Sequence, residues 1–493
     1  KTPTVSATLP AVSNPGVGFR SHTVANLGAT LTDDGGQLPD VAFHYWESGT
    51  TATNTVPAGM REEETFIWPV GGLASGLTYE YRVSAANGAG TAWSGVSSFS
   101  MLPVNATIYV SSSGDNTDAS TWATAYSDPA VAFASAESGD TIRLAGETFA
   151  AAPGFALSYV YLVDAKSNLR VEGGYQAGGA TPGSRDPAKW PTILMRSSGS
   201  ASVLRIQNSP DIVVEGVTIT GGSYIQGGGV YLSGATQSAW LENCIITNNL
   251  LPAAGNTTDG GAGVFLASGT AVVTNCLVLG NKIVSSGLDN YYGRGGGVRV
   301  SGGTMTIRSS TIANNVAQGK NKNTAAPYNR GADGGGIYSR ETAAKTHLEN
   351  CTVVSNDFNE ATAIGVRYAA GTLSITNSIV WGHAAGDLSN LPVDGSGHLL
   401  NVGRSLFNDA AMDGVAGCIS ADPLFRNAAA MDFTLQDGRH GAAGVSPAID
   451  SGLRLPWMKG AVDLAGGKRL QSGAVDMGAY EAAGPRATLL LIR

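Results

Sequence analysis

One sequence unit recurs five times between residues 227 and 383. Each copy contains a glycine-rich turn, a short β run, and a second apolar run that ends in Asn or His. The copies pair GGGVYL with LENCIITNN, GAGVFL with VTNCLVLGN, GGGVRV with IRSSTIANN, GGGIYS with LENCTVVSN, and IGVRYA with ITNSIVWGH. Self-similarity at this period is typical of one structural unit stacked on itself. The copies therefore predict a solenoid with one continuous core.

The spacing of the copies indicates coils with insertions at one turn. The final apolar runs begin 27, 32, 34, 41 and 27 residues apart, counted from Val214 through Ile375. Two polar positions recur in these runs, one at Asn243, Asn275, Ser309, Asn350 and Asn377, the other at Asn249, Asn281, Asn315, Asn356 and His383. Stacked amides can bond to one another and to turn backbone groups. We predict an all-β chain whose main part is a right-handed parallel β-helix of pectate-lyase-like type, the hand following the general crossover preference.

Composition limits the other classes of protein. The 67 glycines show no triplet period, so they indicate tight turns rather than collagen. A net charge of −8 argues against a nucleic-acid binder, and no apolar run is long enough to span a membrane. Cys244, Cys276 and Cys351 occupy one repeat position, where the other copies carry Ser310 and Ser378. This pattern predicts a buried ladder of small side chains rather than disulfides or a zinc site.

Residues 1–103 contain alternating β runs but lack the recurring asparagines of the repeats. The stretch GLTYEYRVSAANGAGTAWSG resembles a fibronectin type III module, with Leu77 and Tyr79 at that family's corner. We expect Trp46 to be the core tryptophan of an early strand. The resemblance implies a β-sandwich that acts as a spacer or as a weak glycan-binding arm.

The β-helix is expected to cover residues 104–481, followed by a tail at 482–493. Its parts are a cap and first coils at 104–195, with a short helix after Asp128, regular coils at 196–383, and a closing region at 384–481. DPLF, SPAIDSG and VDMGAYE, in that order, resemble the C-terminal signature of bacterial exported β-helix proteins of the choice-of-anchor Q type. The resemblance implies a secreted or cell-surface protein. Aspartates of the closing region are read as turn and cap residues, with calcium ligands or acids as the alternative.

Alternation in the strand after the glycines predicts an outward row of side chains. If Val230, Val264, Val298, Ile337 and Val366 point inward, then Tyr231, Phe265, Arg299, Tyr338 and Arg367 line up outward. Aromatic faces stack on sugar rings, and guanidinium groups bind carboxylates. We therefore predict a substrate-binding set of Tyr231, Phe265, Tyr291, Tyr328, Tyr338, Arg340 and Arg367. The alternative is that these side chains only coat a solvated sheet.

Charge around the inserts indicates an anionic partner. Residues 282–333 contain seven basic side chains and only two acidic ones, within a chain that is acidic overall. We predict a monomer that binds an acidic polysaccharide, with no nucleic-acid partner.

β-Elimination is the reaction that these residue types favour. It needs a cation to neutralise a uronate carboxylate, a base to remove the adjacent proton, and an acid for the leaving oxygen. Arg294, Arg299 or Arg330 could neutralise, Lys320 or Lys322 could be the base, and Tyr292 or Tyr328 could be the acid. Some polysaccharide lyases of this fold use Ca²⁺, so Ca²⁺ is possible here, although no cofactor or metal ligand is assigned.

Two other functions stay open. A glycoside hydrolase would pair Asp333 with Asp289 or Glu360. However, the repeats contain neither the Asp pair and Gly-His-Gly element of polygalacturonase-like enzymes nor the Arg-x-Pro-x-x-Arg motif of pectate lyases. A non-catalytic adhesin or glycan-binding stalk is the rival from another class. The basic insert residues could equally be solvated loop tips, which would favour that rival.

Overall fold

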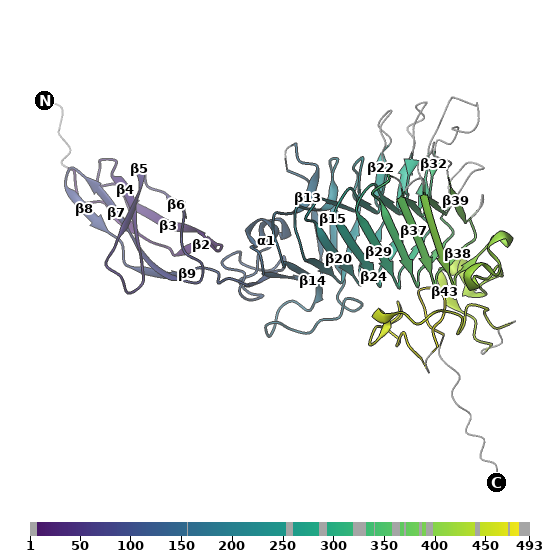
Figure 1. Cartoon of the computed structure of the whole chain (residues 1–493). Helices are drawn as coiled ribbons and strands as arrows, with labels where there is room; N and C mark the ends of the chain where they lie inside the picture. Colours follow the sequence, from purple (N-terminus) through teal and green to yellow (C-terminus); the bar gives the residue numbers. More distant parts are fainter. Residues whose placement is uncertain are drawn as a thin grey trace, which may run out of the picture. The chain divides into compact units, whose positions relative to one another are not determined.

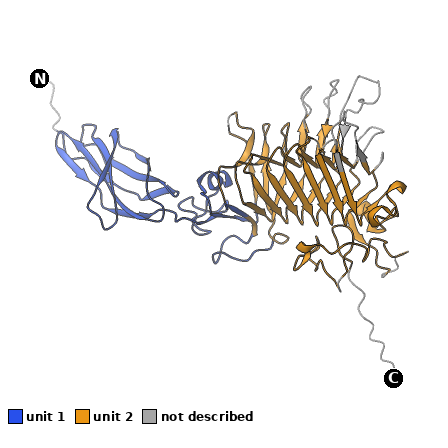
Figure 2. Cartoon of the chain, viewed as in Figure 1, with its two compact units in different colours: residues 1–147, 168–171, 175–186 blue, residues 148–167, 172–174, 187–493 orange. Residues whose placement is uncertain are grey.

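A computed structural model describes residues 7–154, 156–252, 260–284, 293–318, 332–339, 341–356, 365–368, 371–383, 387–390, 398–438, 444–471 and 474–482. The regular structure of these ranges is almost entirely β-strand (Figure 1). Its helical elements are α1 (Pro129–Ser135), η1 (Ala410–Met412), η2 (Val415–Gly417), η3 (Ala428–Ala430) and η4 (Pro456–Met458). The chain forms two compact units, residues 1–147, 168–171 and 175–186, and residues 148–167, 172–174 and 187–493 (Figure 2).

The N-terminal part is an antiparallel sandwich of two sheets. One sheet has the order β1-β3-β2 with β6 on β3, and the other has the order β5-β4-β7-β8 with β9 on β7. The strands are β1 (Ala11–Ser13), β2 (Val17–Arg20), β3 (Val24–Asp33), β4 (Asp40–Glu47), β5 (Asn54–Met60), β6 (Thr65–Gly71), β7 (Thr78–Asn87), β8 (Gly90–Trp93) and β9 (Ser97–Ser100). The hydroxyl of Tyr79 accepts a hydrogen bond from the Ala74 amide at 2.9 Å, as a tyrosine corner requires.

The expectation that Trp46 is a core residue is wrong. Phe43 is fully buried on β4, so Trp46, three residues on, projects from the opposite face of the sheet. Its indole Nε1 donates to Glu80 at 2.8 Å on that outer face. Phe43 and Tyr81 provide the buried aromatic core instead.

Three parallel sheets build the β-helix (Figure 1). The first contains β10 (Thr107–Val110), β11 (Thr141–Ala145), β14 (Arg170–Tyr175), β17 (Ile212–Glu215), β20 (Ser238–Glu242), β24 (Thr270–Thr274), β29 (Thr304–Arg308), β34 (Lys345–Glu349), β37 (Gly371–Thr376) and β40 (His398–Gly403). The second contains β12 (Thr148–Ala151), β15 (Thr192–Arg196), β18 (Val217–Thr220), β21 (Ile245–Thr247), β25 (Leu277–Leu279), β30 (Thr311–Ala313), β35 (Thr352–Val354), β38 (Ile379–Trp381) and β41 (Leu406–Phe407). The third contains β13 (Tyr159–Asp164), β16 (Ser202–Gln207), β19 (Val230–Ser233), β23 (Val264–Leu266), β28 (Val298–Val300), β33 (Ile337–Ser339), β36 (Val366–Tyr368) and β39 (Leu388–Asn390).

The predicted all-β fold with a sandwich, a right-handed β-helix and a capping helix is confirmed. Helix α1 begins as expected, because the Asp128 side chain accepts a hydrogen bond from the Ala130 amide and Pro129 occupies the first turn. No helix within the described ranges is long and apolar enough to cross a membrane.

An amide ladder runs through the interior of the coils, at the second of the two recurring polar positions. It consists of Asn249, Asn281, Asn315, Asn356 and His383, all of which are buried. Each of the first three side-chain amides donates to the next asparagine Oδ1 at 2.9 Å, and the fourth contacts His383 Nε2 at 3.4 Å. The predicted stacking at this position is confirmed.

The other recurring position serves the turn between the first and second sheets. Asn243, Asn275, Ser309, Asn350 and Asn377 all adopt left-handed backbone, with φ between 43° and 54°. Asparagine tolerates this conformation better than most residues, which explains its recurrence there.

The amide ladder also explains the glycine clusters. A Cβ on Gly229 would lie 2.7 Å from the side-chain nitrogen of Asn249, and a Cβ on Gly297 would lie 3.0 Å from that of Asn315. The first glycine of the cluster has φ near +62° in Gly227 and +68° in Gly295. The glycine cluster and the ladder asparagine of each repeat are therefore linked, because the glycines leave room for the asparagine side chains.

The cysteines and closing aspartates have the structural roles that were expected. The four cysteines are buried and free of disulfides, and Cys276 accepts a hydrogen bond from the Cys244 amide at 3.4 Å. In the closing region, which contains β42 (Phe425–Asn427) and β43 (Asp432–Leu435), the Asp463 carboxylate accepts from the Ala465 and Gly467 amides. The Asp476 carboxylate accepts from two further amides.

Candidate functional site at the inserted edge

The predicted outward row exists and is longer than the sequence indicated. We call it the outer ladder; its members, in register on successive strands of the third sheet, are Arg205, Tyr231, Phe265, Arg299, Tyr338 and Arg367. Their inward neighbours Val230, Val264, Val298, Ile337 and Val366 are fully buried in the core, as expected.

Cations and rings alternate along much of the outer ladder. The rings of Tyr231 and Phe265 stack with centroids 5.4 Å apart and planes 14° apart. The guanidinium of Arg205 lies 4.4 Å from the Tyr231 ring, and that of Arg299 lies 5.2 Å from Phe265 and 5.9 Å from Tyr338. Such cation–π contacts gain strength where water is excluded.

Water is in fact excluded from most of the outer ladder. Phe265, Arg299, Tyr338 and Arg367 are each at most 3% exposed, whereas Tyr231 is half-buried. The simple alternative of a solvated coat is therefore wrong for these four side chains. As they lie here, they also present no open face to a glycan, and their role in substrate binding stays a prediction.

Part of the cover comes from the inserts themselves. Short strands β22 (Leu250–Pro252), β26 (Lys282–Val284) and β31 (Val316–Ala317) pair in one small sheet, and β27 (Gly293–Arg294) pairs with β32 (Ala332–Asp333). Isolated β-bridges join Arg294 of β27 to Gly260, and Gly260 to Gln226, so the row of paired backbone continues beyond β27. This row lies against the outer ladder, because a Cβ on Gly260 would approach Arg299 Nη1 to 3.0 Å, and the Arg294 guanidinium lies 5.6 Å from the Tyr338 ring.

A small apolar cluster holds the insert strands in place. Leu251, Ile283 and Ala317, one from each strand of the small sheet, pack with Ala262 of a glycine-rich turn. The inserts thus begin as ordered layers on the coil rather than as free loops, a feature that spacing alone did not reveal.

Of the predicted catalytic set, the structure describes Arg294 and Arg299 and brings both beside Tyr338. Arg294 is the more accessible of the two, being half-buried. Tyr291, Tyr292, Lys320, Lys322, Tyr328, Arg330 and Arg340 lie outside the described residues. Asp289 and Glu360, the proposed partners of Asp333 in a hydrolase, also lie outside them. Their assignments stay predictions.

Metal binding at this edge is likewise a prediction. In the parts of the chain that the structure describes, the acidic group close enough to share an ion is Asp33, Asp34 and Glu63 on the sandwich. The outer ladder offers guanidinium groups and aromatic rings, which are not Ca²⁺ ligands.

Sequence reasoning missed two features of the β-helix. Arg205 extends the outer ladder by one strand. It could have been found from the sequence, because it occupies the same position in the strand SVLRIQ as Tyr231 does in the next strand of the sheet. In the closing region Arg469 is fully buried, and its Nη1 lies 2.9 Å from Glu481. Burial raises the pKa of Glu481 to about 8, although the charge of Arg469 opposes the shift. Nothing in the local sequence distinguished this pair from exposed charges.

The family comparison agrees with the fold of the coils. Residues 196–390 match the family described as right handed beta helix region. Pectate lyase Pel9A is 14% identical, with 76% of this chain and 96% of that chain covered and a TM-score of 0.38. The family 28 exopolygalacturonase of Yersinia enterocolitica is 10% identical, with 80% and 99% covered and a TM-score of 0.16.

The sandwich has matches of its own. The fibronectin type III domain of human fibronectin type III domain containing protein 3 is 18% identical, with 21% of this chain and 93% of that chain covered and a TM-score of 0.16. No curated protein matches the sequence.

Proposed function

We propose that the protein binds an acidic polysaccharide at the inserted edge of the β-helix and cleaves it by β-elimination. The observation that carries the proposal is the half-buried Arg294, whose guanidinium lies 5.6 Å from the Tyr338 ring of the outer ladder, within the most basic inserts of an acidic chain. Export to the cell surface or medium is part of the same proposal.

The reaction divides among the predicted residues as follows. Arg294 or Arg330 neutralises the uronate carboxylate and so acidifies the adjacent C–H, because Arg299 is too deeply covered to reach a polymer. Lys320 or Lys322 removes the proton, the electron pair forms a carbon–carbon double bond, and the bond to the leaving oxygen breaks. Tyr292 or Tyr328 then protonates that oxygen.

A second function, a non-catalytic adhesin or glycan-binding stalk, is favoured by one specific observation. Most of the outer ladder is buried, so its cation–π contacts could serve the stability of a rigid rod alone. In that case the arginines would contribute packing and charge to the coil without touching a ligand.

One assay separates these functions. The full chain is incubated with a panel of uronate polysaccharides, with Ca²⁺ and with a chelator, while ultraviolet absorbance of unsaturated ends and reducing ends are followed together. Growth of both signals supports a lyase, and reducing ends without absorbance indicate a hydrolase. Neither signal, together with retention in gels that contain the polymer, indicates the stalk.

Variants then locate the site. Arg294→Gln and Lys320→Ala should lower the rate by about 100-fold if these groups act in the transition state. Lys345→Ala, which removes an exposed lysine on the first sheet, is the matched control and should leave the rate unchanged. Cleavage that survives the first two substitutions would exclude this site even if the reaction class were right.

A further inference from the structure

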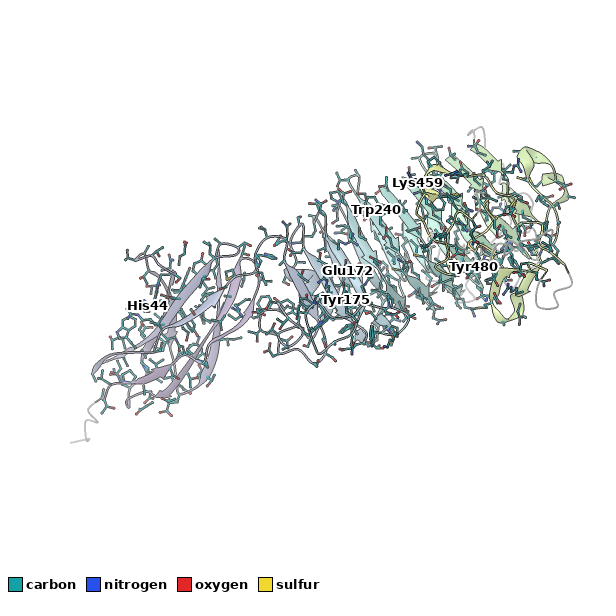
Figure 3. All side chains as sticks on the ribbon, turned by 90° about the horizontal axis from the view of Figure 1, so that it is seen from below. His44, Glu172, Tyr175, Trp240, Lys459 and Tyr480 are labelled. Carbon is teal, nitrogen blue, oxygen red and sulfur yellow. The ribbon has the colours of Figure 1, made fainter. Side chains whose placement is uncertain are left out.

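The outer face of the five-stranded sandwich sheet carries a polar and aromatic cluster outside the apolar core. Within the cross-strand register, His44 on β4 lies opposite Arg82 on β7, and Ser84 lies opposite Trp93 on β8. Their neighbours Phe43 and Val83 point into the core. His44 marks this cluster on the sandwich in Figure 3.

Trp93 is the most exposed member of the cluster. It is 45% exposed, and its ring lies 4.7 Å from the His44 ring at 53°. The Arg82 guanidinium carbon lies 4.1 Å from the Trp93 ring centroid. An open indole surface and a cation therefore share one spot, where a ligand could contact both.

Arg82 has no carboxylate partner among the residues that the structure describes. The nearby Glu80 carboxylate is already used, accepting from Trp46 Nε1 at 2.8 Å and from Ser48 Oγ at 3.3 Å. Arg82 Nε is buried and makes no hydrogen bond in the described structure. A half-buried guanidinium without an anion is unusual, because its desolvation is normally offset by a partner.

A second arginine on the same sandwich shows the usual arrangement. Arg61 also lies over aromatic rings, 4.6 Å from Phe66 and 5.3 Å from Trp68. However, its Nη1 is 3.1 Å from the Glu64 carboxylate. The two sites share a cation over a ring and differ in whether an anion is supplied by the protein.

His44 supplies no competing charge. Its Nε2 is 2.8 Å from Ser84 Oγ and its Nδ1 is 3.0 Å from Thr55 Oγ1, so both ring nitrogens bond to hydroxyl groups. Burial lowers the pKa of His44, and the charge of Arg82 lowers it further. The imidazole is therefore neutral near pH 7, and Arg82 is the cation of the cluster.

We propose that this face is a second glycan site, which takes one uronate unit with its apolar ring face on Trp93 and its carboxylate on Arg82. The choice of a uronate rests on the proposed function, but the site is separate from the inserted edge and does no chemistry. A guanidinium binds a carboxylate through paired, charge-assisted hydrogen bonds, and the indole supplies the flat apolar surface that a pyranose needs. The sandwich would then be an anchoring arm rather than a spacer.

The test measures retardation of the full chain in native gels that contain polygalacturonate, with a fully methyl-esterified polymer as the neutral arm. Arg82→Gln should weaken retardation by roughly tenfold in apparent affinity, the usual worth of a hydrogen bond to a charged group, and Trp93→Ala should weaken it by a similar factor through loss of the stacking surface. Arg61→Gln is the matched control and should not change it. Circular dichroism and thermal unfolding confirm that each variant is folded.

The outcomes separate this inference from the proposed function. Equal retardation of Arg82→Gln, Arg61→Gln and the unsubstituted chain overturns the sandwich site, whatever the cleavage assay gives. Equal retardation by the esterified polymer overturns the carboxylate contact. If no polymer is cleaved and Arg294→Gln changes nothing, yet Arg82→Gln still weakens binding, the proposed reaction fails and the sandwich site stands.

Discussion

Removing one amide from the middle of the amide ladder should destabilise the β-helix strongly. The Asn315 side chain donates to Val278 O at 2.8 Å and to Asn356 Oδ1 at 2.9 Å. Its Oδ1 accepts from the Asn281 side chain at 2.9 Å and from the Asn281 amide at 3.0 Å. Asn315→Ala deletes all four bonds at a fully buried position.

The expected cost follows from this count. A hydrogen bond contributes about 1 kcal/mol net, and a buried group left without a partner costs about 1–3 kcal/mol, so we expect a loss of roughly 3–5 kcal/mol. Backbone strain adds nothing, because the left-handed residue is Asn314 and not Asn315. The variant thus reports on the side-chain bonds alone.

Urea unfolding followed by circular dichroism gives the free energy, and hydrogen exchange of peptides covering residues 278–282 and 311–317 gives its location. A solenoid can open locally, so exchange should rise first in the coils on either side of residue 315. The control is Asn401→Ala, an exposed amide whose one bond to Ser374 Oγ is 3.4 Å long, with an expected change within about 0.5 kcal/mol. A loss below about 1 kcal/mol for Asn315→Ala, or equal to that of the control, would refute the reasoning.

Gly297→Ala should cost about 1–3 kcal/mol in urea unfolding, because its Cβ would lie 2.7 Å from the Gly336 carbonyl oxygen and 3.0 Å from the Asn315 amide, whereas Gly403→Ala meets nothing within 4 Å and should be neutral. Burial lowers the pKa of His22, but the buried Asp140 carboxylate 2.7 Å away outweighs this and raises it above the ordinary value. The pair therefore stabilises fully below about pH 6.5 and loses this stabilisation as pH rises through the folded pKa, so His22→Gln should flatten a plot of melting temperature against pH; an unchanged plot would contradict the pairing. Burial raises the pKa of the Cys351 thiol to about 12, so the native chain should resist thiol reagents until denaturant exposes all four cysteines, and fast labelling of the native chain would contradict that burial.

The repeat made the coil, its register and the amide ladder predictable, because identical side chains at a fixed period can only stack. It also predicted which residues of the third sheet point outward. It could not predict that Phe265 and Arg299 are covered, because cover depends on the path of inserts whose lengths and sequences do not repeat. Trp46 was misplaced for a simpler reason. Successive side chains of a strand point to opposite faces of the sheet, so an assignment that is wrong by one position turns a core side chain into a surface one.

The amide ladder also has a direction. Each ladder asparagine from Asn249 onward donates to the next side chain on its C-terminal side, in addition to a backbone carbonyl of the preceding coil, so the row needs an acceptor at its far end. His383 provides one with Nε2, which places its proton on Nδ1, and that proton is donated to Asp387 at 2.9 Å. A carboxylate thus terminates a line of parallel dipoles at their positive end. Because each internal rung offers one acceptor upstream and one donor downstream, an extra coil could be spliced in anywhere between Asn249 and Asn356, but not past His383. The β-helix can therefore gain coils within the amide ladder, whereas a coil added after His383 would find no ladder donor or acceptor to pair with.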